Sequence, residues 1–483
     1  MAQQWRRRLG DRVVRRPRLR EISPVRLGPQ RERPGAIPAS KYLLFWLVAG
    51  FLALILMGAG LLLLPVASTG EGPAPFLTAL FTATSAVTVT GLVVVSTGTY
   101  WTVFGQAVIL VLIFIGGLGF MSAGTLLFII IGRRATLGQL LLLRESLGEM
   151  HMGRLVSLVW RIVLVAMGIQ VLGFALLLFH FSGMFDGAKA TWQALFHAVS
   201  GFNNAGFDLM PGTSSLSDFR QDYTVLAIMG ALIVLGGISF TVMVDLVRER
   251  RFRRLTLDTQ LVLVTSLVLW LVGAVVAFAF EYRNSSTLGG LPVAGQVANS
   301  FFHSITARTA GFSTFDVGSA QQQTNVFYTV LMFIGGASGS AAGGIKVNTL
   351  AVIAVAVFAT LRGRGRAEVF RREVPDVQVF RAMSVVALAL SSIFVVALLL
   401  TITEQTVMSG GVGFIDLLFE TFSAFATVGL STGITSKLTP GGQWLIMLTM
   451  FVGRLGPLTL ALGLAMREKR PVYRYAQERV KIG

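Results

Sequence analysis

The sequence contains no cysteine, and only four histidines occur in 483 residues. The absence of cysteine excludes disulfide bonds and thiolate metal sites. Because the histidines are scattered, the chain offers neither a nucleophile–base constellation nor a set of metal ligands of the kind that an enzyme needs. We therefore expect no catalytic residues and no cofactor bound by this chain.

Charged residues are also scarce, at 13% against roughly 25% in soluble proteins. Hydrophobic residues make up 54% of the chain, and the mean hydropathy is +0.71. Eight apolar stretches reach the length of about 20 residues that crosses a bilayer core. They lie at residues 41–64, 102–131, 158–181, 222–247, 259–281, 324–360, 380–402 and 442–466. Eight such stretches in series predict an all-α integral membrane protein with eight transmembrane helices rather than a soluble protein with buried core helices.

Basic residues are concentrated in alternate loops. Most of the 41 Lys and Arg lie in residues 1–41, 132–161, 248–254, 362–381 and 467–483. This alternation follows the positive-inside rule, so it predicts that both termini are cytoplasmic. We expect these segments to fix the orientation and to contact anionic membrane lipid, and we expect no nucleic-acid partner.

Four segments between successive pairs of apolar stretches share one pattern, in which a Phe stands ten positions before a Gly. The segments are FTATSAVTVTGL from Phe81, FHAVSGFNNAGF from Phe196, FFHSITARTAGF from Phe301 and FETFSAFATVGL from Phe419. Six positions before the Gly, three of them carry a serine, namely Ser85, Ser200 and Ser423. Four matches in register predict internal repetition.

We predict four parallel helix–pore-loop–helix repeats around one pseudo-fourfold pore. Each repeat starts and ends in the cytoplasm, which argues against the inverted repeats of many secondary transporters. The predicted organisation is a basic cytoplasmic arm (1–40), repeat 1 (41–131), a cytoplasmic linker (132–157), repeat 2 (158–254), repeat 3 (255–366), repeat 4 (367–470) and a C-terminal tail (471–483).

Each of the four segments fits a short helix followed by a non-helical strand that lines the pore. The Gly permits dihedral angles closed to other residues, so successive carbonyls can face one axis and replace the hydration shell of a cation. The predicted ion-binding residues are Thr88, Val89, Thr90 and Gly91, Asn203, Asn204, Ala205 and Gly206, Arg308, Thr309, Ala310 and Gly311, and Ala426, Thr427, Val428 and Gly429.

Two departures from the repeat predict where the pore is controlled. Five glycines at 335–344 should break the second helix of repeat 3, which indicates a flexible gate or, alternatively, a kink for helix packing. Arg454 stands where the other repeats have glycine, and a charge at this depth needs a cavity or a partner. Glu420 and backbone carbonyls are the candidate partners. The predicted gate residues are Gly335, Gly336, Gly339, Gly343, Gly344, Lys346 and Arg454.

Three further charged residues lie beside the predicted filter. We expect Arg308 to brace the filter backbone through its fixed fork of donors. Asp208 and Asp316 lie just outside the filter glycines, where a carboxylate either concentrates cations or caps a loop.

The motifs TVTGL, NNAGF, RTAGF and TVGLS, the break GGASGSAAGGIK and the ending VGRLGPLT resemble the KtrB family. These are the membrane pore subunits of bacterial Ktr K⁺ uptake systems, within the wider Trk/Ktr/HKT superfamily. The resemblance covers residues 41–483. It implies a homodimer in the bacterial plasma membrane with one K⁺ pore in each chain, and a cytosolic nucleotide-binding regulatory ring (KtrA-like) beneath it. It also assigns the four glycines to the filter, residues 335–346 to the gating loop, Arg454 to the pore and the C-terminal tail to the dimer contact.

The resemblance bears on the ion as well. A serine in the first filter marks Na⁺-permeable members, and all four filters here keep Gly, so K⁺ at the filter backbone is the expected ion. Na⁺ is a candidate activator, and a nucleotide is expected only on the regulatory partner. The alternative is a Na⁺-permeable or Na⁺-coupled transporter of the same fold.

Overall fold

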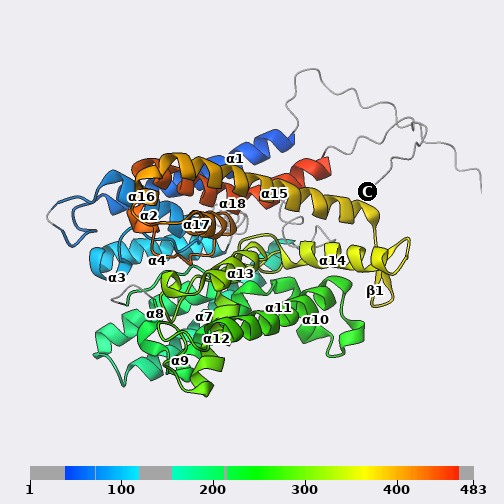
Figure 1. Ribbon diagram of the computed structural model, residues 1–483, viewed down its shortest axis with the longest axis horizontal. Coiled ribbons are helices and arrows are strands. Elements are labelled where there is room, and N and C mark those ends of the chain that lie inside the picture. Colours follow the sequence, from blue (N-terminus) through cyan, green and yellow to red (C-terminus); the bar gives the residue numbers. More distant parts are fainter. Residues whose placement is uncertain (1–38, 71, 119–154, 211–214, 467–483) are drawn as a thin grey trace, which may run out of the picture.

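The structure, a computed structural model, describes residues 39–70, 72–118, 155–210 and 215–466, which are mainly helical (Figure 1). The helices are α1 (Ala39–Leu62), α2 (Phe76–Thr88), α3 (Thr97–Tyr100), α4 (Val103–Gly117), α7 (Leu155–Phe181), α8 (Gly187–Phe202), α9 (Tyr223–Gly237), α10 (Phe240–Arg248), α11 (Leu257–Glu281), α12 (Val293–Thr306), α13 (Gln322–Phe333), α14 (Val347–Leu361), α15 (Asp376–Thr403), α16 (Gln405–Ser409), α17 (Phe414–Ala426) and α18 (Pro440–Met466). Short 3₁₀ helices are η2 (Ser217–Phe219), η3 (Phe252–Arg254), η4 (Val317–Ser319) and η5 (Thr435–Lys437).

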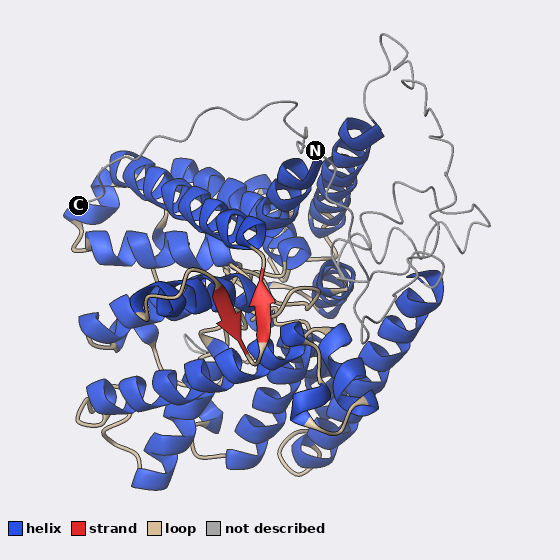
Figure 2. Cartoon of the chain, turned by 90° about the vertical axis from the view of Figure 1, so that its right-hand side faces the viewer, coloured by secondary structure: helices blue, strands red, loops and turns tan. Residues whose placement is uncertain are grey.

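Two strands, β1 (Ala367–Val369) and β2 (Arg372–Val374), form an antiparallel hairpin between α14 and α15 (Figure 2). Nearly all of the predicted N-terminal arm (1–40), most of the predicted linker (132–157) and the whole predicted tail (471–483) lie outside the described residues.

Three described helices are long and apolar enough to cross a membrane, namely Trp160–Phe181, Leu257–Glu281 and Asp376–Thr403. The pair α9 and α10 makes a fourth if it is counted as one span, although it bends by 96°. The apolar stretch at 222–247 is therefore divided between two helices. The bend follows Gly236 and Gly237, and the new helix starts where the Ser239 hydroxyl accepts a hydrogen bond from Thr241 N (3.3 Å) and so caps it.

The helices form four similar sets. In each set a long helix packs against a shorter helix that leads to a filter glycine: α1 with α2, α7 with α8, α11 with α12, and α15 with α17. Neighbouring sets then meet through the pairs α4–α8, α9–α12, α13–α17 and α18–α2. Because α18 returns to α2 and also contacts α1, the first and last sets lie side by side (Figure 1).

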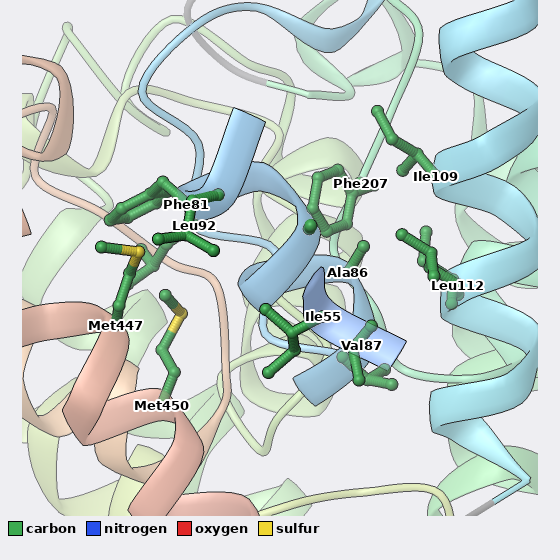
Figure 3. Close-up of a cluster of buried hydrophobic side chains, with 14 of the residues drawn as sticks. Ile55, Phe81, Ala86, Val87, Leu92, Ile109, Leu112, Phe207, Met447 and Met450 are labelled. Carbon is green, nitrogen blue, oxygen red and sulfur yellow. The ribbon is translucent and has the colours of Figure 1, made fainter. Parts of the chain in front are cut away.

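A buried apolar cluster seals the contact between these two sets (Figure 3). It joins Ile55 of α1, Phe81 of α2 and Leu112 of α4 to Met447 and Met450 of α18. The outward faces of the long helices are also apolar, as Phe179 (86% exposed), Val275 (67%) and Leu398 (60%) illustrate. Exposed apolar side chains in such numbers fit a surface that faces lipid.

Candidate functional site

The four predicted filter segments share an unusual backbone conformation. Two positions before each filter glycine stands a non-glycine residue with positive φ: Val89 (56°), Asn204 (57°), Thr309 (77°) and Thr427 (49°). The glycines have positive φ as well: Gly91 (86°), Gly206 (70°), Gly311 (81°) and Gly429 (97°). Left-handed conformations are costly for residues with a Cβ, so the recurrence of this pattern at four matching positions indicates one shared local structure.

The four glycines lie against one another in chain order. A Cβ on Gly206 would come within 3.0 Å of Ala310 O and 3.2 Å of Gly311 Cα. The same relation, at comparable or closer range, holds from Gly91 to Ala205 and Gly206, from Gly311 to Val428 and Gly429, and from Gly429 back to Thr90 and Gly91. We call this closed set of Gly91, Gly206, Gly311 and Gly429 the glycine ring. The residues predicted as a filter are thus brought together from segments far apart in the sequence.

Serine side chains hold three of the four strands, a role that the sequence analysis did not predict for them. Ser85 Oγ accepts a hydrogen bond from Gly91 N, and Ser423 Oγ accepts one from Gly429 N, both at 3.1 Å. Ser200 Oγ donates to Phe207 O at 2.6 Å. The third segment has Ile305 at this position, and Gly311 N bonds the carbonyl of Thr306 instead (3.3 Å).

Two buried hydroxyl groups beside the ring have no hydrogen-bond partner within the described part of the chain, namely Thr309 Oγ1 and Thr427 Oγ1. An unpaired buried hydroxyl costs about 1–3 kcal/mol. Thr309 and Thr427 are also the residues of positive φ in the third and fourth segments.

The glycine-rich segment, which we define as residues 334–346 between α13 and α14, is closed at its base. Gly335 N donates to Ile345 O (2.9 Å), and Ile345 N donates to Phe333 O (3.0 Å). We call this paired base the neck. The helix break predicted from the five glycines is therefore confirmed, since α13 ends at Phe333 and α14 begins at Val347.

The tip of the glycine-rich segment bonds the end of α9. Ala337 N donates to Gly237 O (3.0 Å), and Ala341 N donates to Gly236 O (3.1 Å). The last carbonyls of a helix lack intrahelical donors, and the bend after Gly237 leaves these two free to accept. Sequence reasoning missed this contact. The only signal for it was the motif LGGIS at residues 235–239, whose small residues resemble those of the other sets.

One of the predicted gate glycines, Gly343, lies against a ring segment. A side chain on Gly343 would clash with Thr427 and with Ala426 O, so the glycine-rich segment packs directly on the fourth filter segment. Gly339 and Gly344 have positive φ (79° and 65°). Lys346 Nζ donates to Ala342 O (2.6 Å), which turns its charge back onto the segment.

Arg454 bonds carbonyls, one of the two alternatives for its partner. Its Nη1 donates to Ala341 O (2.9 Å) and its Nη2 to Gly116 O (2.8 Å). Glu420, the other candidate, accepts hydrogen bonds from the Ser431 and Thr435 hydroxyls instead. Arg454 therefore bridges the tip of the glycine-rich segment to the end of α4.

The expectation that Arg308 braces the filter backbone is wrong. Its Nη2 donates to Gly335 O (2.9 Å) and its Nε to Ile334 O (3.4 Å), so it reaches the neck. The helix break leaves these carbonyls without helical donors, and the arginine is long enough to satisfy them. The side chain also approaches Ser266 and Trp270 of α11, two residues that the sequence analysis did not single out.

The two carboxylates beside the ring cap loops. Asp208 Oδ1 accepts a hydrogen bond from Met210 N (2.9 Å). Asp316 Oδ1 accepts one from Gly318 N (3.0 Å), and Asp316 caps η4. These contacts bear out the loop-capping alternative.

The TrkH family of cation transport proteins matches residues 47–472 of the chain. Over 437 residues the chain is 41% identical to Ktr system potassium uptake protein B of Bacillus subtilis, covering 90% of this chain and 96% of that protein. It is 38% identical to the potassium/sodium uptake protein NtpJ of Enterococcus hirae, with 90% and 96% covered. The fold is similar to the crystal structure of the potassium transporter TrkH from Vibrio parahaemolyticus, with a TM-score of 0.67 and 17% identity over 90% of this chain and 87% of that one.

Proposed function

Since this chain belongs to the TrkH family of cation transport proteins, we propose that it takes up K⁺ across a cell membrane through a pore at the glycine ring. The observation that carries the proposal is the ring itself: four segments with one dihedral pattern that meet in chain order. Backbone carbonyls gathered in such a ring replace the hydration shell of a dehydrated cation. Transport is passive and is driven by the inside-negative potential, worth about 2.3 kcal/mol per charge for each 100 mV.

The architecture that goes with this function is four parallel repeats with eight membrane crossings, divided as predicted at residues 41–131, 158–254, 255–366 and 367–470. Both termini lie in the cytoplasm of a bacterial cell, and the protein resides in its plasma membrane. The four helix sets, each with a filter glycine, support this arrangement, and so do the exposed apolar faces of α7, α11 and α15.

The glycine-rich segment acts as the gate. It packs on the fourth filter segment through Gly343 and is tied down by Arg454 and by the end of α9. All of these bonds run to backbone groups of a segment rich in glycine. They can therefore be exchanged without repacking large side chains.

The relative from Bacillus subtilis is named as part of a Ktr system, which supports a protein that works with other components. We infer a homodimer and a cytosolic nucleotide-binding ring of the KtrA kind, with the nucleotide held by that ring. In this assembly K⁺ is the transported ion, and Na⁺ is an activator if one is needed.

A second candidate function is Na⁺ transport, or Na⁺-coupled transport, by the same pore. It is favoured by one observation: the relative from Enterococcus hirae, at 38% identity, is named a potassium/sodium uptake protein. Glycine at all four ring positions favours K⁺ over this alternative.

The test is ion uptake by the full chain in proteoliposomes, with its regulatory partner supplied, under an inside-negative potential. We expect accumulation of ⁸⁶Rb⁺, a K⁺ tracer, that unlabelled K⁺ suppresses and Na⁺ does not. Equal suppression by both ions would support the Na⁺-permeable alternative, and no uptake of either ion would refute a cation pore.

A further inference from the structure

We propose that Arg308 couples the third filter segment to the neck of the glycine-rich segment, so that the position of the neck changes ion discrimination at Gly311. This inference rests on the proposed function. In it, Arg308 is a positioning residue: it acts through the backbone and does not touch the ion.

The placement of Arg308 is the first observation. It lies between the end of α12 and Gly311, three positions before that glycine, and its side chain is 5% exposed. A charge buried this far needs hydrogen-bonded partners. Its partners are two carbonyls that follow α13, the backbone carbonyl and the hydroxyl of Ser266, and the face of an indole ring.

The two carbonyls belong to the neck. Gly335 O, at 2.9 Å, and Ile334 O, at 3.4 Å, follow directly on the last residue of α13. The neck is also where Gly335 N and Ile345 O pair. One guanidinium thus ties the start of the third filter strand to the base of the glycine-rich segment, and a displacement of the neck pulls on that strand.

The other contacts of the guanidinium are with a long helix, α11. Its Nη2 lies 3.5 Å from Ser266 Oγ, and its carbon stands 5.6 Å from the centre of the Trp270 ring, within the range of a cation–π contact. Both residues belong to α11, one of the long helices that can cross the membrane. Arg308 therefore contacts both the neck and α11, so a movement of the neck relative to α11 changes its contacts.

The matching positions in the other three segments carry no such link. They are Thr88, whose hydroxyl bonds Thr84 O within its own helix, Asn203, whose amide bonds Val199 O and Gln170 Oε1, and Ala426, which has no polar side chain. Asn203 reaches the long helix of its own set, as Arg308 does, but it bonds no helix break. Only the third position combines a filter segment, a long helix and a gate.

A cavity of about 20 Å³ beside the guanidinium gives it space to follow the neck. It is lined by Arg308, Ser266, Trp270, Gly237 and Gly336, among others. A volume of this size holds about one water molecule. Protein interiors are otherwise close-packed, so the gap marks a place where a side chain can shift without displacing its neighbours.

The experiment is a double-mutant cycle on the full-length protein in proteoliposomes, read as the ratio of K⁺ to Na⁺ flux. Deleting residues 338–341 removes the tip contacts made through Ala341 and disturbs the neck. When Arg308 is present, we expect this deletion to change the flux ratio about fivefold, which is the size of a coupling between neighbouring residues. In the Arg308→Gln background, we expect the deletion to leave the flux ratio unchanged. Arg283→Gln, which removes an exposed guanidinium on the loop after α11, is the control, and in that background the deletion should act as it does in the wild type.

Equal effects of the deletion with and without Arg308 would overturn the proposal, and so would a deletion that leaves the ratio unchanged in the wild type. If Arg308→Gln does not fold, as judged by thermal unfolding, Arg308→Lys replaces it; lysine keeps one charged donor and loses the fork. In the Arg308→Lys background, a change in the flux ratio on deletion that is smaller than in the wild type then supports the coupling. A change equal to that in the wild type contradicts it. Wild-type protein that moves no K⁺ would refute the proposed function itself. This outcome distinguishes a failure of the proposed function from a failure of the coupling through Arg308.

Discussion

A side chain on any glycine of the ring would enter the neighbouring segment. Gly311, with φ of 81°, shows both constraints at once: its conformation is one that side chains rarely adopt, and a Cβ there would press on Val428 O and come 3.1 Å from Gly429 Cα. A change at one glycine therefore disturbs two adjacent strands. The geometry of the ring therefore depends on four backbones that must fit together.

Replacing Gly311 by Ser should weaken the discrimination between K⁺ and Na⁺ about tenfold, because a residue with a Cβ pays about 1–2 kcal/mol in this backbone region. The measurement is the ratio of the two fluxes in proteoliposomes. Gly363→Ser is the control: Gly363 also has positive φ (68°), but nothing lies within 4 Å of the added Cβ. A flux ratio in Gly311→Ser that matches this control would count against a filter at the ring.

Two arginines at membrane depth use the same chemistry. Arg308 and Arg454 both donate to carbonyls that helix ends leave free. The sequence marked both residues, because charges are rare in such segments. The sequence could not show which groups accept their hydrogen bonds, because every residue has a backbone carbonyl. A carbonyl is free to accept only where a helix ends, and the fold decides which helix ends lie close to each arginine.

At the level of elements, the glycine-rich segment differs from an ordinary helix kink in having a base and a tip that are held separately. The base is paired with itself through Gly335 and Ile345, whereas the tip is held by α9 and by Arg454. The tip can therefore leave its own partners without breaking the hydrogen bonds of the base, and the short chain between them passes the displacement on to the neck. This division favours a gate over a packing kink.

Deleting residues 338–341 should raise the K⁺ flux without the regulatory partner about tenfold, because the charged hydrogen bond to Ala341 O, worth roughly 1.5–3 kcal/mol, is lost. Flux into proteoliposomes measures the effect. A deletion of Gly410 and Gly411, two exposed residues of the turn after α16, shortens a loop elsewhere and should leave the flux as it was. A flux that stays at the wild-type level after the first deletion would argue that the segment only packs helices.

The elements also show how far sequence reasoning reaches. Composition and spacing predicted the helical fold, the four matching glycine segments and the helix break after Phe333, because each rests on a local signal: apolar length, glycine or register. The 96° bend between α9 and α10 was missed. Its small residues fit close helix packing equally well, and the partners of the bend, Ala337 N and Ala341 N, which donate to the carbonyls of Gly237 and Gly236, lie about 100 residues later in the chain.

For the molecule as a whole, the contact between the first and last helix sets is the seam that closes the ring. Its cluster includes Phe81 and Met450, both fully buried. Gly429 and Gly91, which lie against each other in the ring, belong to the same two helix sets. The stability of the seam and the geometry of the ring are therefore linked.

Met450→Ala should lower the unfolding free energy by about 2–5 kcal/mol, the usual cost of truncating a buried methionine. The measurement is thermal unfolding of the purified protein in detergent. Leu448→Ala, two positions away on the same helix but 59% exposed, should change the midpoint little. If both variants unfold at the same temperature, the seam does not stabilise the closed ring.

The seam also determines when in its synthesis the protein can become a pore. Arg454 bonds Gly116 across 338 residues of chain, and Gly429 completes the ring against Gly91 at a similar separation. A ribosome makes the N-terminal partner of each pair first, so a chain that ends before Gly429 lacks both the fourth glycine of the ring and Arg454. The closed ring and the arginine bridge are thus completed over residues 429–454, and a product truncated before Gly429 has neither.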